Sequence, residues 1–437
     1  MKPKMSFIGL VLLSLLILLW GCSNTQNSAN VPDEKQVEQV TQKPQATIED
    51  TGLELKVKPL EKNAEIVIPD VQVEDFPVPE NEAMAFTRQM KIGWNLGNTF
   101  DAFSDSPSLK NELDLESYWC GVMTTREMIA SVKNAGFNTL RIPVSWHNHV
   151  SGNQFTISEA WMDRVQQVVD YAMAEDMYVI LNIHHDIAEA YYYPSAKHMD
   201  NSTAYVKAVW RQIAERFKNY NEHLIFESVN EPRLTGTPFE WWLNMSDPLC
   251  LEAVECVNKL NQVFVDTVRA SGGNNKTRYL MVPGYCASAD YALLDEFRLP
   301  TDTQDNKIIV SVHAYTPYAF ALQSPGEPGS ISAWRVTNPG SRRDIDWFMT
   351  GLYEKFIQKG IPVVIGEFGA RDKGGNLQDR VEFSAYYIRS ARARGMTCLW
   401  WDNNSFAGNG ENFGLFERSS LSWPGQIIVD AMMKYAE

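Results

Sequence analysis

"HLIFESVNEPR", residues 223–233, is the stretch that decides how this chain folds and where its chemistry lies. The apolar run at its start predicts a buried strand. Directly after that run come the amide of Asn230 and the carboxylate of Glu231, and Pro232 then ends the strand. Such a polar pair is either an ordinary loop contact or part of a catalytic site, and the rest of the chain distinguishes the two.

Similar apolar runs recur from about residue 85 onward, and stretches with helical spacing lie between them. Within 158–176, for example, apolar side chains from Trp161 to Ala172 share one helical face, and Ser158 stands at the N-cap position. Buried strands that alternate with helices are typical of a parallel sheet covered on both faces. Eight such strands predict a single (β/α)8 TIM barrel, of the α/β class, over residues 81–437. The runs are residues 91–97, 136–143, 177–185, 223–230, 278–285, 307–315, 361–369 and 396–403.

An open, doubly wound α/β sheet is the competing architecture. That fold usually carries a Gly-rich phosphate-binding turn, GxGxxG, after its first strand. The corresponding segment here, "GWNLGN" at residues 93–98, lacks this spacing. The sequence therefore favours the barrel.

The composition limits the class of partner. The chain has 437 residues, of which 44% are hydrophobic and 21% charged, so apolar material for a large core is ample. A net charge of -15 argues against nucleic-acid binding, which requires basic patches. Thirteen tryptophans suit carbohydrate rings, although core packing accounts for most tryptophans in proteins.

The N-terminus predicts export. Lys2 and Lys4 precede the apolar run 7–20, which ends at Gly21 and Cys22, as in a secretory signal. "LLWGC" resembles the lipobox of bacterial lipoproteins, although Trp20 stands where a smaller residue is usual. We therefore expect a signal segment over 1–22, lipidation of Cys22, and a protein anchored by lipid in the cell envelope or else secreted. An uncleaved membrane anchor is the alternative.

Residues 23–80 are polar and acidic, which predicts a flexible linker. Its more apolar part, residues 53–76, is a candidate for strands that pack against the main domain. Beyond Cys22 the chain has five cysteines and no CxxC pair, so at least one thiol is free and a thiolate zinc site is not expected. We expect a monomer that needs neither a cofactor nor a metal.

Polar residues stand at the carboxyl ends of almost all these runs. In a barrel those ends form the catalytic face. The two glutamates among these residues, Glu231 and Glu367, stand on different strands, and paired carboxylates are what glycoside hydrolysis requires. The polar residues at this rim are Asn98, Arg141, His184, His185, Asn230, Glu231, His313, Tyr315, Glu367, Trp401 and Asp402.

Several segments resemble those of a known family, in the right order over roughly residues 90–435. "RIPVSW" at 141–146, "LIFESVNEP" at 224–232, "HAYTPY" at 313–318 and "VVIGEFGA" at 363–370 resemble glycoside hydrolase family 5. "KIGWNLGNTFDA" at 91–102 resembles the endoglucanase subfamily 4 of that family. The resemblance implies a retaining, endo-acting hydrolase of β-1,4-glucosidic bonds in cellulose or related β-glucans. The same mechanism on xyloglucan, mixed-linkage glucan, xylan or mannan remains an alternative.

The resemblance also implies roles for the rim residues. Glu231 matches the acid/base and Glu367 the nucleophile, with Arg141 and Tyr315 expected to contact Glu367. We expect like-charge repulsion from Glu367 to raise the pKa of Glu231. The remaining matches are Asn230 to the residue that binds the sugar 2-hydroxyl, His184 and His313 to the cleavage subsite, and Trp401 to the floor under the sugar, with Asn98 and His185 as further candidates.

Two rival functions follow from the same residues. A non-catalytic glycan-binding lipoprotein would have lost one of the catalytic carboxylates, and both are present. A metal-dependent barrel hydrolase would need a ligand cluster such as HxH on the first strand. The adjacent pair His184 and His185 is a poor substitute, because neighbouring strand residues point to opposite faces.

Overall fold

The computed structural model describes residues 65–104, 111–408 and 410–437, so the predicted signal segment and most of the predicted linker lie outside the described residues. Parallel strands close into a barrel in the order β1-β10-β9-β8-β7-β6-β5-β2, as the sequence predicts. The strands are β1 (Ile92–Leu96), β2 (Thr139–Ile142), β5 (Tyr178–Asn182), β6 (Leu224–Glu227), β7 (Leu280–Ser288), β8 (Ile308–His313), β9 (Val363–Phe368) and β10 (Thr397–Asp402), with a small hairpin of β3 (Val150–Ser151) and β4 (Thr156–Ile157).

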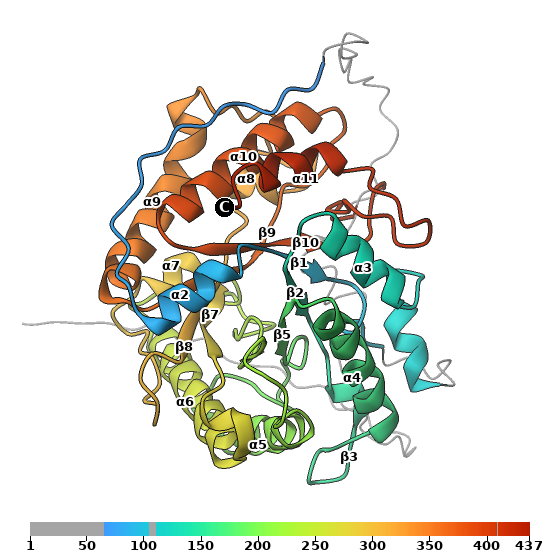
Figure 1. Cartoon of the computed structure of the whole chain (residues 1–437). Coiled ribbons are helices and arrows are strands. Elements are labelled where there is room, and N and C mark those ends of the chain that lie inside the picture. The colour runs from blue at the N-terminus through green and yellow to red at the C-terminus, as the bar shows by residue number, and fades with distance from the viewer. Residues whose placement is uncertain (1–64, 105–110, 409) are drawn as a thin grey trace, which may run out of the picture. The chain divides into compact units, whose positions relative to one another are not determined.

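Helices surround the barrel (Figure 1). In α4 the predicted apolar face from Trp161 to Ala172 is buried. Ser158 is the N-cap of α4, but its hydroxyl makes no cap hydrogen bond and instead donates to Glu112 at 2.5 Å. The helices are α2 (Glu82–Gln89), α3 (Arg126–Asn134), α4 (Glu159–Ala174), α5 (Met199–Arg216), α6 (Pro248–Ala270), α7 (Ala289–Ala292), α8 (Tyr318–Ala321), α9 (Pro339–Lys355), α10 (Leu377–Ala393) and α11 (Gln426–Met433).

Helix α2 closes the amino-terminal end of the barrel. Its residues Ala83 and Phe86, with Met90 just beyond it, form a cluster with inward-facing side chains such as Ile225 of β6 and Leu399 of β10. Apolar burial of this kind stabilises a fold by about 25 cal/mol per Å² removed from water. The amino-terminal end of the barrel is therefore a packed core, which leaves the carboxyl end for chemistry.

The side chains that point into the barrel change from apolar to polar toward the carboxyl ends of the strands. Two residues after Ile225 on β6, the same inward face carries Glu227, and two residues after Ile309 on β8 it carries Ser311. The Ser311 hydroxyl donates to Glu227 at 2.5 Å. The alternation of side chains thus places a buried polar layer directly above the apolar one.

The predicted linker boundary is partly wrong, because residues 65–80 pack on the barrel domain. Val71 is buried, and its backbone N–H donates to the hydroxyl of Tyr435 at 2.8 Å. The N–H of Phe76 donates to the carbonyl of Ala393 at 2.8 Å, so the segment runs along α10 (Figure 1). The segment forms no strand within 65–80. It packs because its own residues are partly apolar, which the high average polarity of residues 23–80 did not reveal.

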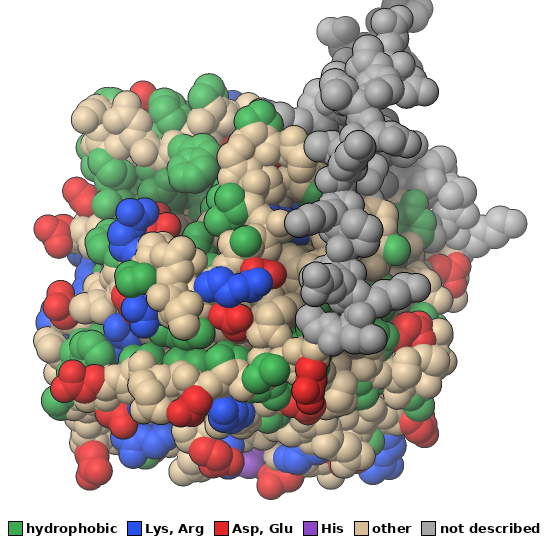
Figure 2. Space-filling model, turned by 90° about the horizontal axis from the view of Figure 1, so that it is seen from above, with side chains coloured by type: hydrophobic (Ala, Val, Ile, Leu, Met, Phe, Trp, Pro, Cys, Tyr) green, Lys and Arg blue, Asp and Glu red, His purple; other side chains and the backbone are tan. Residues whose placement is uncertain are grey.

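On the face shown in Figure 2, Lys and Arg side chains lie scattered among acidic ones rather than gathered into one basic patch. Among the described residues, no helix is both long and apolar enough to cross a membrane. The five described cysteines are free thiols.

Candidate active site

Arg141 of β2 lies at the centre of the polar layer, and its side chain is fully buried. Its Nε donates to Glu227 at 2.7 Å. Nη1 donates to Glu367 at 2.7 Å and to Asn95 at 3.0 Å. Nη2 donates to Asn230 at 2.8 Å and lies 3.4 Å from Nε2 of His313. All five N–H groups of the guanidinium therefore have a partner.

Glu227 is a site residue that the sequence interpretation missed. It is fully buried, and besides Arg141 it accepts hydrogen bonds from Asn182 at 3.0 Å and from Ser311. A carboxylate at the end of the apolar strand "LIFE" was a signal in the sequence. It was overlooked because the interpretation assigned the polar end of this strand to Asn230 and Glu231, a few residues later. Glu227 supplies the negative charge that a buried Arg141 requires.

Glu367 ends β9 beside this layer, as predicted. One oxygen accepts from Arg141, and the other accepts from the hydroxyl of Tyr315 at 2.9 Å. Both contacts expected for this carboxylate are therefore present. Two directed donors hold the carboxylate in one orientation, which is what attack on a fixed carbon atom requires.

Glu231 lies opposite Glu367, and His313 lies between them. Nδ1 of His313 is 2.8 Å from Glu231 and 3.6 Å from Glu367. A carboxylate oxygen of each glutamate and a ring nitrogen of His313 all lie within 4.8 Å of one another. The sequence prediction that two carboxylates remote in the chain meet in one place is therefore confirmed for their positions.

The hydrogen bonds of His313 fix where its proton lies. Its Nε2 faces the Arg141 guanidinium, which can only donate, so Nε2 accepts and Nδ1 carries the hydrogen that points at Glu231. Burial alone would raise the pKa of Glu231, but this hydrogen bond and the charges of His313 and Arg233 outweigh burial and leave the pKa below its ordinary value. The expectation of a raised pKa in the free protein was wrong, because these donors were not visible in the sequence.

His184 and His185 lie together, which corrects the expectation that they diverge. Strand β5 ends at Asn182, so the alternation of a strand no longer applies at 184 and 185. The two rings meet edge to face with centroids 4.4 Å apart, and each ring offers an atom close to Asp101. Burial, with the neighbouring His185 and Arg141, lowers the pKa of His184, so the imidazole is neutral.

Asp101 is a second residue that the sequence interpretation missed. Burial raises the pKa of its carboxyl to about 7 although the backbone N–H groups of Thr99 and Asn98 donate to it. Those donors use both of its oxygens, and Nδ1 of His184 lies 3.1 Å from the amide of Asn182. The cluster of Asp101, His184 and His185 is spaced like a metal site, but these partners already orient two of its three members.

The remaining predicted residues lie as follows. Trp401 of β10 is parallel to the ring of His184, with centroids 5.8 Å apart, and so lies at the same mouth. A Cβ at Gly97 would come within 2.8 Å of the Trp401 ring, which explains the glycine in "GWNLGN". Asn98 has a left-handed backbone, φ 57°, and among the described residues its side chain does not bond to the set around Arg141. Asp402 accepts from the indole of Trp94 and is structural.

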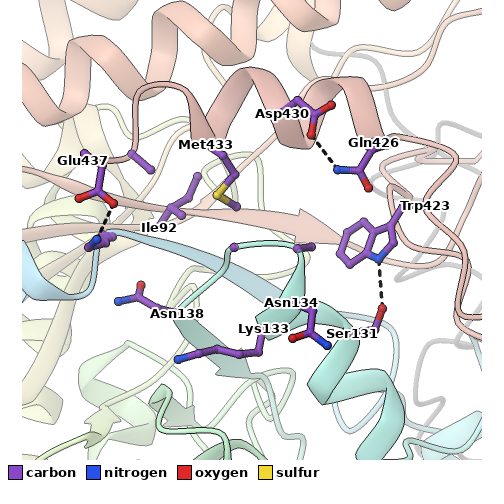
Figure 3. Close-up of a pocket in the computed structure, with 14 residues that line it drawn as sticks. Ile92, Ser131, Lys133, Asn134, Asn138, Trp423, Gln426, Asp430, Met433 and Glu437 are labelled. Atoms are coloured by element: carbon purple, nitrogen blue, oxygen red, sulfur yellow. Dashed lines mark hydrogen bonds and ion pairs between the residues drawn. The ribbon is translucent and has the colours of Figure 1, made fainter.

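A cavity of about 860 Å³ lies away from these groups (Figure 3). It lies between α3 and α11 at the amino-terminal end of β1, and its lining includes Ile92, Asn138 and Met433. The indole of Trp423 in its wall donates to Ser131 at 3.1 Å and stacks on Phe416, so the ring is engaged in packing. The chemistry belongs to the carboxyl end of the barrel and not to this cavity.

A parallel barrel whose mouth brings two carboxylates within 4.8 Å, one of them held by a buried arginine and a tyrosine, defines a barrel glycoside hydrolase. The profile of Cellulase (glycosyl hydrolase family 5) matches residues 99–407. This chain belongs to glycoside hydrolase family 5.

Individual relatives agree with this assignment. The chain is 64% identical to a GH5 family lichenase from Caldicellulosiruptor sp. F32, with a TM-score of 0.85 over 85% of this chain and 100% of that one. It is 43% identical to Endoglucanase B of Ruminococcus albus over 380 residues, 86% of each chain. It is also 43% identical to a GH5-4 broad specificity endoglucanase from Ruminococcus champanellensis with bound cellotriose, with a TM-score of 0.74 over 82% of this chain and 100% of that one.

The buried pair of Arg141 and Glu227 yields a first prediction. Glu227→Gln should lower kcat by about 100-fold, because Arg141 loses the charge that orients it beneath Glu367. It should also cost about 3 kcal/mol of unfolding free energy. Steady-state kinetics and thermal unfolding measure the two effects.

Asp302→Asn is the matched control. Asp302 pairs with Arg269, also with little exposure, outside the hydrogen-bonded set around Arg141. This variant should lose stability but keep its kcat. Equal kcat losses in the two variants would contradict a specific role for Glu227.

Proposed function

We propose that this protein is an exported endo-β-1,4-glucanase that cleaves β-glucan chains internally with retention of anomeric configuration. Glu231 is the general acid/base and Glu367 is the nucleophile. The observation that carries the proposal is the spacing of the two carboxylates, whose oxygens approach within 4.8 Å. Retaining enzymes hold these groups about 5–5.5 Å apart, whereas inverting enzymes need about 6.5–9.5 Å to admit a water.

In the first step an oxygen of Glu367 attacks the anomeric carbon, and the bond from that carbon to the glycosidic oxygen breaks. Glu231 gives its proton to the departing oxygen, and a covalent glycosyl ester on Glu367 remains. The glycan expels water from the mouth, which strengthens the repulsion between the two carboxylates and favours the protonated form of Glu231. Asn230, whose carbonyl oxygen accepts from Arg141, turns its amide N–H groups toward the sugar 2-hydroxyl.

In the second step Glu231 accepts a proton from water, and the water oxygen attacks the same carbon. The ester bond breaks and Glu367 regains its negative charge, which Arg141 and Tyr315 receive through their hydrogen bonds. Two inversions at one carbon restore the original configuration. Trp401 and the neutral His184 contact the sugar in the cleavage subsite.

The substrate is a β-glucan with β-1,4 bonds, and mixed-linkage glucan and cellulose derivatives are the preferred polymers. Likeness to a lichenase and to broad specificity endoglucanases supports this choice. Xyloglucan, xylan and mannan are the alternatives, because aromatic and loop contacts beyond the cleavage subsite determine specificity. The reaction needs no metal and no cofactor, and the enzyme acts as a monomer.

Replacement of either glutamate tests the roles. Glu231→Gln and Glu367→Gln should each lower turnover by several orders of magnitude, about 10³-fold or more, with unchanged circular dichroism. With an activated aryl glycoside and added azide, Glu231→Ala should yield the β-glycosyl azide and Glu367→Ala the α-azide. Azide attacks the covalent ester in the first variant and the substrate itself in the second. Near-normal activity of either Gln variant would remove that residue from the mechanism.

The products test substrate and stereochemistry together. Mixed-linkage glucan and carboxymethyl cellulose should lose viscosity before much reducing sugar appears, which is the mark of internal cleavage. Proton NMR of the first product should show the β anomer, and the activity should survive a chelator. An α anomer as first product would refute the double displacement. Faster turnover of xylan or mannan would show that one of these polymers, and not a β-glucan, is the preferred substrate.

We also propose that lipid on Cys22 anchors the enzyme at the cell envelope. Support comes from the sequence of residues 1–22 alone. The wild-type chain expressed in bacteria should incorporate labelled palmitate and sediment with membranes, and Cys22→Ala should incorporate none. Unlabelled protein that still sediments with membranes would indicate an uncleaved anchor, and unlabelled protein in the medium would indicate secretion.

A further inference from the structure

Arg233 lies two residues beyond Glu231 in the loop that follows β6. Its side chain is buried, with 8% exposure. Its Nη1 is 3.6 Å from Oε2 of Glu231 and also donates to the backbone carbonyl of Glu231 at 3.0 Å. A permanent cation is thus held against both the carboxylate and the backbone of the same residue.

The loop itself fixes this guanidinium. Nε of Arg233 donates to Glu240 at 3.3 Å, and Cζ of the guanidinium lies over the ring of Trp241, 4.2 Å from its centroid. The other oxygen of Glu240 accepts from the N–H of Gly236 at 2.9 Å. Because an ion pair, a cation–π contact and a backbone hydrogen bond hold one side chain, Arg233 has little freedom to turn away from Glu231.

We propose that Arg233 is a positioning residue that biases Glu231 toward its carboxylate form and so favours the step in which Glu231 acts as a base. The proposal rests on the assignment of Glu231 as acid/base in the proposed function. Arg233 contacts neither the anomeric carbon nor the nucleophile in this scheme and acts through Glu231 alone.

Among the other groups that face Glu231, His313 is the one that competes with Arg233, because Glu367 and Glu231 raise its pKa against the effect of burial and it lowers the pKa of Glu231 more than Arg233 does. His185, after β5, has a pKa lowered to about 3 by burial and by Arg233, so it is neutral. Burial also raises the pKa of Cys286 on β7 well above its ordinary value, so the thiol is neutral. His313 of β8 donates a hydrogen bond, and Glu367 of β9 supplies a negative charge.

The charge balance therefore changes between the two steps. While Glu367 is ionised, its negative charge opposes Arg233 and helps Glu231 to keep a proton. Once Glu367 is an ester, that opposition is gone, and the Arg233 cation then favours ionised Glu231 when a base is required. The lowered pKa of Glu231, to which Arg233 contributes after burial and His313, agrees with this arrangement.

Removal of the Arg233 charge should shift the basic limb of the pH profile to higher pH. Loss of the cation raises the pKa of Glu231, so the protonated acid persists to higher pH. The basic limb of kcat/KM, which reports loss of that acid in the free enzyme, then moves upward. A residue that only supports the loop would lower kcat and leave this limb in place.

The experiment measures kcat/KM against pH for the full chain with phenyl β-cellobioside, whose leaving group needs a proton. Arg233→Gln should move the basic limb up by about one pH unit, and Arg233→Lys, which keeps the charge, should move it by less than about half a unit. The double variant Arg233→Gln with Glu240→Gln should behave like the single one, which excludes an effect of a stranded Glu240. Arg269→Gln, the buried control paired with Asp302, should leave the limb unchanged.

A second substrate separates this inference from the proposed function. The leaving group of 2,4-dinitrophenyl β-cellobioside departs without a proton. With this substrate, the basic limb and its shift should both disappear from the pH profile of kcat/KM. An unmoved limb in the Gln variants, or a shift that persists with the dinitrophenyl substrate, overturns the inference. Failure of the wild-type chain to hydrolyse either substrate refutes the proposed function instead. If the single Gln variant does not fold, the double variant gives the same readout.

Discussion

The fold depends on the burial of one positive charge at the barrel axis. Arg141 is removed from water, and an isolated buried cation costs far more than a protein can offset, so every N–H must find a partner. Its partners come from β1, β6, β8 and β9 and from the loop after β6. The strands must close around it in one register for all five contacts to form. The same set of hydrogen bonds therefore specifies both the closed barrel and the orientation of Glu367.

Stability and chemistry occupy different ends of this barrel. At the amino end, α2 and the inward apolar side chains of the strands form a dry layer. Two residues further along the strands the inward positions become polar, as Glu227 and Ser311 illustrate. The apolar layer beneath the polar one supplies the free energy of folding that offsets the unfavourable desolvation of the polar groups. The lichenase and the broad specificity endoglucanase compared above share this fold at TM-scores of 0.85 and 0.74, while the substrates named for them differ.

The two carboxylates that meet at the barrel mouth, Glu231 and Glu367, are chemically alike but lie in different surroundings. Glu367 accepts from a guanidinium and a phenol, which suits the proposed nucleophile, because that group is negative at the start and end of each turnover. Glu231 accepts from the imidazole of His313 and stands near a second guanidinium, that of Arg233, so its charge responds to what happens at Glu367. In the proposed mechanism, this difference suits Glu367 to be the nucleophile and Glu231 to alternate between acid and base.

The sequence by itself determined the fold class, the positions of the eight strands, and the rim residues from Arg141 to Trp401, because period and polarity are local properties of a chain. It missed Glu227, Asp101 and Arg233 and misjudged the pKa of Glu231, and it expected His184 and His185 to diverge. It also extended the linker over residues 65–80, which the structure packs on α10. Those features depend on which groups from distant segments meet, and on how far each is from water. Only closure of the barrel decides them, because Coulomb and hydrogen-bond energies depend on distances in space and not on spacing along the chain.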